Sequence, residues 1–164
     1  MKGGKTEGER IADEIGMALN GGAWHGPSLT EVLSGLTWKD AIQRPIPAAH
    51  NIWELVLHMT AWTREVASRV RGADAKSPPE DWPAPRFGGG EPAWKSAKDD
   101  LAAAQNEIEA AVAALQAADL VRWIENREGT SCSVGTVIRG LLQHHTYHEG
   151  QIAILKRAAE TAGT

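Results

Sequence analysis

Residues 133–157 of the chain read SVGTVIRGLLQHHTYHEGQIAILKR. Apolar side chains recur there at steps of three and four, at Val134, Val137, Ile138, Leu141, Leu142, Ile152 and Leu155. This period is typical of one buried face of a long α-helix. At about 100° per residue, His144 and His148 fall inside the same apolar sector. The buried face therefore carries imidazoles where leucines would pack more favourably.

These histidines need partners, because each neutral ring takes one donor and one acceptor out of water. A metal ion supplies one, since histidines at i and i+4 on a helix can direct one nitrogen each at a common cation. Two ligands make a weak site, so we expect a third elsewhere. The alternative is a set of core histidines that are hydrogen-bonded to neighbours. Spacing alone leaves open whether His144 or His145 pairs with His148.

Composition and charge describe an ordinary globular chain. The 164 residues are 42% hydrophobic and 23% charged, which predicts one domain over residues 1–164. The net charge of −4 argues against nucleic acid or an anionic membrane as a partner. No apolar run reaches membrane-spanning length, and we expect no signal peptide because the N-terminal MKGGKTEGER is polar and is not followed by an apolar core. The single cysteine, Cys132, excludes an internal disulfide and favours a cytoplasmic location.

The remaining sequence predicts an all-α chain, with no alternating pattern that indicates a strand. Apolar periodicity and stop signals predict long helices over residues 6–20, 50–72, 91–118 and from 133 onward, with short helices over 28–33 and 38–43. Ser28 is placed to cap the first short helix. Residues 73–92 hold five prolines and no periodicity, so we expect a long loop, pinned by Trp82 and Phe87. Four long helices with short inserts between the first two form a bundle, whose sites are built from facing helices.

His58 lies at the edge of the apolar face of the second long helix, where it can meet His144 and His148 in the core. Three neutral nitrogens with an open fourth position suit a catalytic zinc-type site, and imidazole also suits nickel and iron. Glu54, at i, i+4 from His58, is either an acceptor for a ring N–H or a solvated acid.

Several further side chains allow more than one functional interpretation. Trp24 and His25, in the glycine-rich first connection, form either a pocket wall or a plug for the end of the bundle. Cys132 lies at the start of the last helix, where it is either an activated thiol or an inert buried one. His25, Glu54 and His145 are the candidates for a general base.

The segments HNIWELVLHMTAW, at 50–62, and QHHTYHEGQIAILK, at 143–156, resemble the second and closing helices of the DinB superfamily, which includes YfiT-like proteins. GGAWHGPSL, at 21–29, resembles a segment of one branch of that family. The resemblance implies an up-and-down four-helix bundle, often dimeric, with one divalent metal ion held by three histidines. Carried over by residue, the ligands are His58, His144 and His148, while His145 takes a non-ligand position.

The resemblance also implies that Gln151 supports the site, whereas Glu149 stands where many members carry arginine. Members resemble metal-dependent hydrolases and transferases that use a low-molecular-weight thiol. The resemblance therefore implies a metal-dependent enzyme that acts on a small molecule and forms a homodimer. The alternative is a metal-binding, stress-related bundle without turnover, which a closed, fully coordinated site would indicate.

Overall fold

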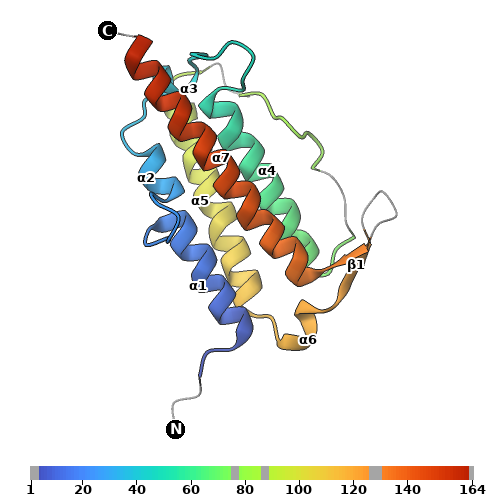
Figure 1. Cartoon of the computed structure of the whole chain (residues 1–164). Helices are drawn as coiled ribbons and strands as arrows, with labels where there is room; N and C mark the ends of the chain where they lie inside the picture. Colours follow the sequence, from blue (N-terminus) through green and yellow to red (C-terminus); the bar gives the residue numbers. More distant parts are fainter. Residues whose placement is uncertain (1–3, 75–77, 86–88, 126–130, 163–164) are drawn as a thin grey trace.

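The computed structural model describes residues 4–74, 78–85, 89–125 and 131–162. Within these residues, the long helices α1 (Glu7–Asn20), α4 (Ile52–Val70), α5 (Glu91–Ala113) and α7 (Val134–Ala162) pack side by side (Figure 1). The short helices α2 (Leu29–Leu33) and α3 (Trp38–Ala41) lie between α1 and α4, and α6 (Ala117–Leu120) follows α5. The predicted all-α bundle with short inserts between its first two long helices is confirmed.

Local capping explains where several of these helices begin. Thr6, Ser28, Thr37 and Asn51 each accept a hydrogen bond from the backbone N–H three residues on, and an acidic side chain at that position returns one. The cap of α4 is Asn51, and its partner is Glu54. The start of the helix that carries His58 is therefore fixed by its own sequence.

The core lies between the four long helices and is built from aliphatic side chains and two buried tryptophans. Trp53 on α4 and Trp94 on α5 are almost fully buried, with ring centroids 5.4 Å apart, and the Trp94 indole N–H donates to the Leu36 carbonyl. Burial of these two large aromatic side chains stabilises the contact between α4 and α5. Trp24 is fully exposed, so it is neither a pocket wall nor a plug within this chain.

Two short strands were not predicted. β1 (Trp123–Glu125) and β2 (Ser131–Ser133) pair in antiparallel register, with Ile124 opposite Cys132. Each strand is three residues long, which is too short to produce a recognisable alternation. Cys132 thus lies on a strand just before α7. The Val134 N–H donates to the Arg122 carbonyl, which ties the start of α7 to β1.

The helix predicted over 91–118 ends at Ala113, and α6 follows as a separate turn. The alanine-rich sequence contains no glycine or proline near Ala113 that would indicate the end of the helix. The prediction from periodicity therefore extended the helix to residue 118.

The chain between α4 and α5, residues 71–90, is here called the connector. Figure 1 shows its described residues running back alongside α4, so that α4 and α5 run in the same direction while α1 and α7 run in the other. Consecutive long helices therefore do not all alternate in direction, although the expected up-and-down order implies that they do. The connector has no helix or strand in its described residues, 71–74, 78–85 and 89–90. Its length follows from this path, because it must travel back along a helix of 19 residues. Across the described chain, none of the helices combines the length and apolarity that crossing a membrane requires.

Candidate metal centre

Three histidines from two helices converge beneath the connector. His58 comes from α4, and His144 and His148 come from successive turns of α7. The Nε2 atom of His144 lies 3.0 Å from Nε2 of His58 and 3.0 Å from Nε2 of His148. Within the described chain, these three residues form the group whose donor atoms all lie within 4.8 Å of one another. The structure thus brings the three predicted ligands together.

Hydrogen bonds fix the tautomers of two of the rings. Nδ1 of His58 lies 2.7 Å from the main-chain oxygen of Asp81, which can only accept, so the ring donates its Nδ1–H there. Nδ1 of His148 likewise donates to Oε1 of Gln151 at 2.6 Å. In neutral rings, both Nε2 atoms therefore keep an unprotonated lone pair. Gln151 does contact His148, as the family resemblance implies.

The donor set fits a cation. The lone pairs of His58 and His148 both face His144 Nε2, and one ring nitrogen holds at most one proton, which cannot satisfy both contacts well. Nδ1 of His144 is buried and has no hydrogen-bond partner among the described residues. A positive ion among the three Nε2 atoms removes this crowding of lone pairs. Three imidazole nitrogens with one side open match the ligand set of a catalytic zinc-type site.

Burial keeps the two candidate ligands on α7, His144 and His148, neutral. Desolvation lowers the pKa of His144 to about 4, with smaller contributions from the charges of His148 and His58. Desolvation also lowers the pKa of His148, although its hydrogen bond to Gln151 acts in the opposite direction. A ligand histidine must be neutral to bind a metal ion. At neutral pH His144 is therefore already in the neutral form that metal binding requires.

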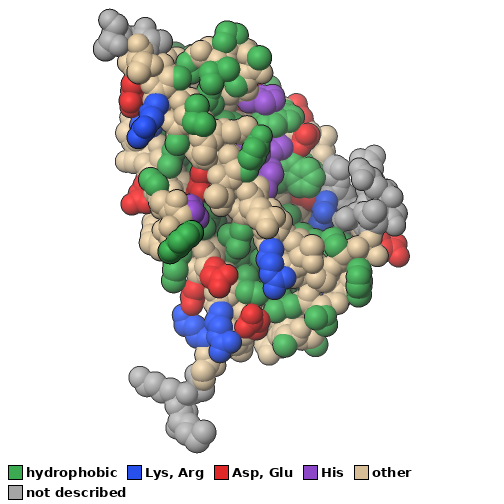
Figure 2. All heavy atoms as spheres, in the orientation of Figure 1, with side chains coloured by type: hydrophobic (Ala, Val, Ile, Leu, Met, Phe, Trp, Pro, Cys, Tyr) green, Lys and Arg blue, Asp and Glu red, His purple; other side chains and the backbone are tan. Residues whose placement is uncertain are grey.

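The three histidines open onto a cavity of about 580 Å³ between α4, α7 and the connector. Its walls are mostly apolar and come from Trp62, Val66, Val137, Leu141, Trp82 and Tyr147, with Arg69, Asp81, Cys132 and Thr136 as polar members. Figure 2 shows histidine side chains reaching the surface next to apolar ones where α7 runs against α4. A small molecule can therefore reach the open side of the cluster.

His145 faces a different environment from its neighbour. It is buried, and its Nε2 lies 2.9 Å from the hydroxyl of Thr63, whose own proton goes to the Met59 carbonyl. Desolvation lowers the pKa of His145 to about 3. This is the arrangement of a core histidine with a protein partner. The choice between His144 and His145 that spacing left open is thus resolved in favour of His144 as the member of the cluster.

The other base candidates lie outside the lining of this cavity. Glu54 pairs with His50, 3.1 Å away, and with Arg44, so the acceptor for the His58 N–H is Asp81 instead. His25 is partly exposed in the α1–α2 connection, with Nε2 3.9 Å from the buried carboxylate of Glu149. A catalytic role for His25, Glu54 or His145 stays a prediction.

Asp81 and Trp82 are the site residues that the sequence did not indicate. Asp81 accepts from His58 through its main chain and from the Trp62 indole through Oδ1, at 2.7 Å. Trp82, which was expected only to pin the loop, stacks on His58 with ring centroids 3.9 Å apart. Phe87, its expected companion, lies outside the described residues. No periodic signal marks residues 81 and 82, because they belong to an irregular segment.

Comparison with protein families matches residues 24–152 to the DinB superfamily. The matched range contains all three clustered histidines and most of the bundle. Searches of the curated proteins and of the solved structures found no match.

Proposed function

Because this chain belongs to the DinB superfamily, we propose that it is a metal-dependent enzyme whose three-histidine centre activates water or a low-molecular-weight thiol. The observation that carries the proposal is the convergence of three Nε2 atoms at the wall of an accessible cavity. A divalent zinc, nickel or iron ion bound there supplies Lewis acidity, which lowers the pKa of a water or thiol and makes it a nucleophile at neutral pH.

The chain itself contributes ligand orientation and a shaped cavity. His58 and His148 present fixed tautomers because Asp81 and Gln151 hold their other ring nitrogens. The apolar walls accommodate the body of a small organic substrate and reduce its contact with water. Hydrolysis and thiol transfer use the same centre and differ in which nucleophile enters it.

Proton transfer needs a base within reach of the nucleophile. Of the carboxylates in the described chain, that of Asp81 lies in the cavity lining. We propose Asp81 as the first residue to test, ahead of His25, Glu54 and His145. Asp81→Asn keeps the main-chain acceptor for His58 and an oxygen for Trp62, so it should lower kcat while metal affinity is retained. Loss of metal by this variant would argue against a role in proton transfer.

The alternative is a bundle that binds a metal ion without turnover. Such a site is expected to be closed and fully coordinated by protein. In the described residues, the cluster of potential ligands contains three histidines, and the cavity lies directly beside them. Both observations favour the enzyme over the sequestering protein.

The test begins with the metal content of untagged protein. The metal-loaded protein is then supplied with glutathione, bacillithiol or mycothiol and an electrophilic chromogenic probe, and in parallel with a panel of chromogenic esters and amides. We expect turnover above the uncatalysed rate in one of the two assays, lost on chelation and restored by the metal. His148→Ala serves as the variant without a complete ligand set, and His145→Gln as the matched control.

Two results would contradict the proposal. If the protein takes up no divalent metal, or if His148→Ala binds it with wild-type affinity, the three histidines do not form a metal centre. Metal-loaded protein that is inactive with every thiol and ester, although small ligands do enter the cavity, would favour the sequestering alternative.

A further inference from the structure

We propose that Trp82 is a positioning residue for His58, and that a stack of His50, Trp82 and His58 holds the His58 ring with Nε2 facing His144 and His148. The inference rests on the proposed metal centre. It assigns a role in the metal centre to the connector, a segment outside the two helices that supply the histidines.

His58 needs such support more than the other two histidines do. His144 and His148 share one helix, so their relative placement is set by helix geometry. His58 comes from a second helix and must meet them across the interface between α4 and α7. A side chain rotates about two torsions, and rings at a metal site have to be held close to the productive orientation.

The hydrogen bond to Asp81 supplies only part of this constraint. The Nδ1–H of His58 points at the Asp81 carbonyl over 2.7 Å, which restricts rotation of the ring within its own plane. It leaves the ring free to tilt about the axis of that bond. The neighbouring residue of the connector restricts the tilt.

Trp82 covers one face of His58. The two ring centroids are 3.9 Å apart and the ring planes differ by 8°. Tilting His58 would drive it into the indole, so Trp82 fixes the plane while Asp81 fixes the direction. An imidazole that binds a cation also gains partial positive charge, which the face of an indole stabilises. The contact should therefore favour the metal-bound form.

The opposite face of Trp82 is covered as well. The His50 ring lies 3.5 Å from it, with planes 3° apart. Nδ1 of His50 contacts Glu54 at 3.1 Å, and Glu54 also pairs with Arg44. The indole is thus enclosed between one imidazole at the metal centre and a second that is anchored at the start of α4.

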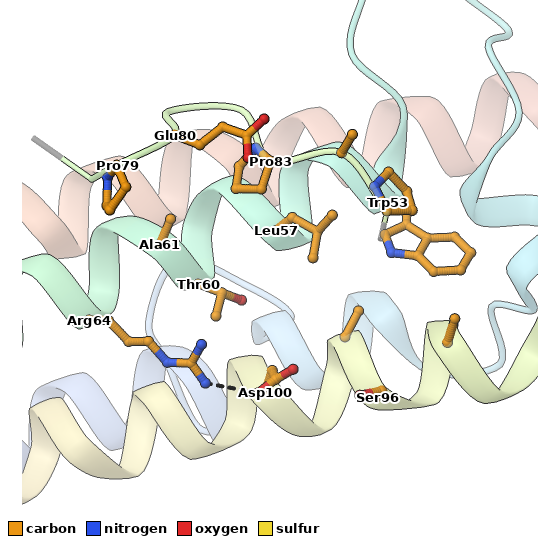
Figure 3. A pocket seen from close by; sticks show the side chains of 14 residues that line it. Trp53, Leu57, Thr60, Ala61, Arg64, Pro79, Glu80, Pro83, Ser96 and Asp100 are labelled. Atoms are coloured by element: carbon orange, nitrogen blue, oxygen red, sulfur yellow. Dashed lines mark hydrogen bonds and ion pairs between the residues drawn. The ribbon is translucent and has the colours of Figure 1, made fainter. Parts of the chain in front are cut away.

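The connector is fixed on both sides of α4. While Asp81 and Trp82 face the histidine cavity, Pro79, Glu80 and Pro83 line a separate groove of about 420 Å³ between α4 and α5. Figure 3 shows this segment passing over α4 above Leu57 and Ala61, with Arg64 paired to Asp100 across the groove. Prolines restrict the backbone of this segment, which keeps residues 81 and 82 in register with His58.

The test measures Co²⁺ binding by the full-length protein, with no substrate present. Affinity comes from competition with a chromophoric chelator, and the d–d absorption spectrum reports the coordination geometry. Trp82→Leu should weaken Co²⁺ binding about 10- to 100-fold, the usual effect of removing a group that orients a ligand, and should change the spectrum. Trp82→Phe, which keeps an aromatic face, should stay within about threefold of wild type.

Two further variants control for loss of fold. His50→Ala removes a half-exposed ring from the outer face of the stack and should weaken binding about threefold without loss of helix by circular dichroism. Trp123→Leu removes an exposed tryptophan that does not line the cavity and should leave affinity and spectrum unchanged.

Wild-type affinity and spectrum in both Trp82→Leu and His50→Ala would overturn this inference and leave the proposed function intact. Equal weakening by Trp82→Leu and Trp82→Phe would also overturn it, because an aromatic face would then not matter. If wild-type protein binds no Co²⁺, the proposed function and this inference both fail.

Discussion

His144 and His145 are neighbours in the sequence with opposite surroundings, because successive residues of a helix point about 100° apart. His144 Nε2 belongs to the three-histidine cluster and its Nδ1 has no partner in the described chain, whereas His145 is buried against Thr63. The first ring is arranged for a ligand, and the second contributes to the folded state itself.

We therefore expect the two alanine substitutions to have opposite effects. His144→Ala should abolish stable metal binding and change the free energy of unfolding of the metal-free protein by less than about 1 kcal/mol. His145→Ala should keep the metal and cost about 2–3 kcal/mol, because it leaves a cavity and removes a buried hydrogen bond. Metal-to-protein ratios after dialysis and urea unfolding measure the two effects. Equal metal loss in both variants would refute the ligand assignment.

Glu149 is a buried carboxyl group whose ionisation should make the stability of the protein depend on pH. Burial raises the pKa of its carboxyl group to about 7, and the nearby Leu29 backbone amide offsets only a part of this. Neither carboxylate oxygen makes a hydrogen bond of good geometry in the described chain. The pKa in the folded state thus lies above the ordinary value of 4.5. The folded state holds a proton that the unfolded state has lost, and stability falls as pH rises from about 4.5 to about 7.

Glu149→Gln removes this ionisation. The difference in free energy of unfolding between this variant and wild type should depend on pH. From pH 4.5 to pH 8 it should shift by about 1–3 kcal/mol in favour of the variant. Urea unfolding of both metal-free proteins at the two pH values measures the effect. The other titrating groups cancel in the comparison. A difference between the two proteins that does not vary with pH would show that the carboxyl group titrates normally.

At the scale of elements, Gly8 lies where α1 packs tightly against the end of α5. A Cβ atom there would lie 2.5 Å from the carbonyl oxygens of Val112 and Leu115, which are backbone atoms and cannot rotate away. Gly150, on α7, has no such neighbour within 4 Å. The two glycines thus offer a matched pair, one in the contact between two helices and one on an open helix surface.

Gly8→Ala should lower the free energy of unfolding by about 2–3 kcal/mol, because α1 must move away from the end of α5. Gly150→Ala should raise it by about 0.5–1 kcal/mol through helix propensity alone. Thermal unfolding followed by circular dichroism compares them. Wild-type stability in Gly8→Ala would mean that α1 is not packed so closely.

Elements with local signals could be predicted from the sequence, and those without them could not. The starts of α1, α2 and α4 follow from Thr6, Ser28 and Asn51, whose side chains cap the backbone within three residues. The end of α5 at Ala113 and the strand pair had no comparable local signal. The parallel course of α4 and α5 depends on the packing of the whole chain.

At the scale of the whole molecule, the site combines residues that differ in how predictable they are. Periodicity placed histidines on two apolar helix faces, and the family resemblance selected His58, His144 and His148 from them. Asp81 and Trp82 could not be foreseen, because they reach His58 only through the return path of the connector. The donor atoms were thus predictable, and the groups that orient them required the tertiary structure.

A centre that joins two helices should also stabilise the fold when it is occupied. A metal ion that binds the folded state alone, at 100 times its Kd, adds about 2.7 kcal/mol to the free energy of unfolding. We expect a higher Tm on addition of Zn²⁺ or Ni²⁺ to chelator-treated protein, reversed by the chelator. His148→Ala should show little of this increase. An equal rise in Tm for that variant would mean that the ion binds elsewhere.

His58 and His144 lie 86 positions apart in the sequence, and this separation has a consequence for biosynthesis. As the ribosome extends the chain, α4 and α5 emerge first, and His58 meets neither of its companions until α7 has left the exit tunnel. An incomplete chain that lacks α7 does not contain the three-histidine cluster. Capture of a metal ion by the proposed centre therefore requires that translation has passed the closing helix.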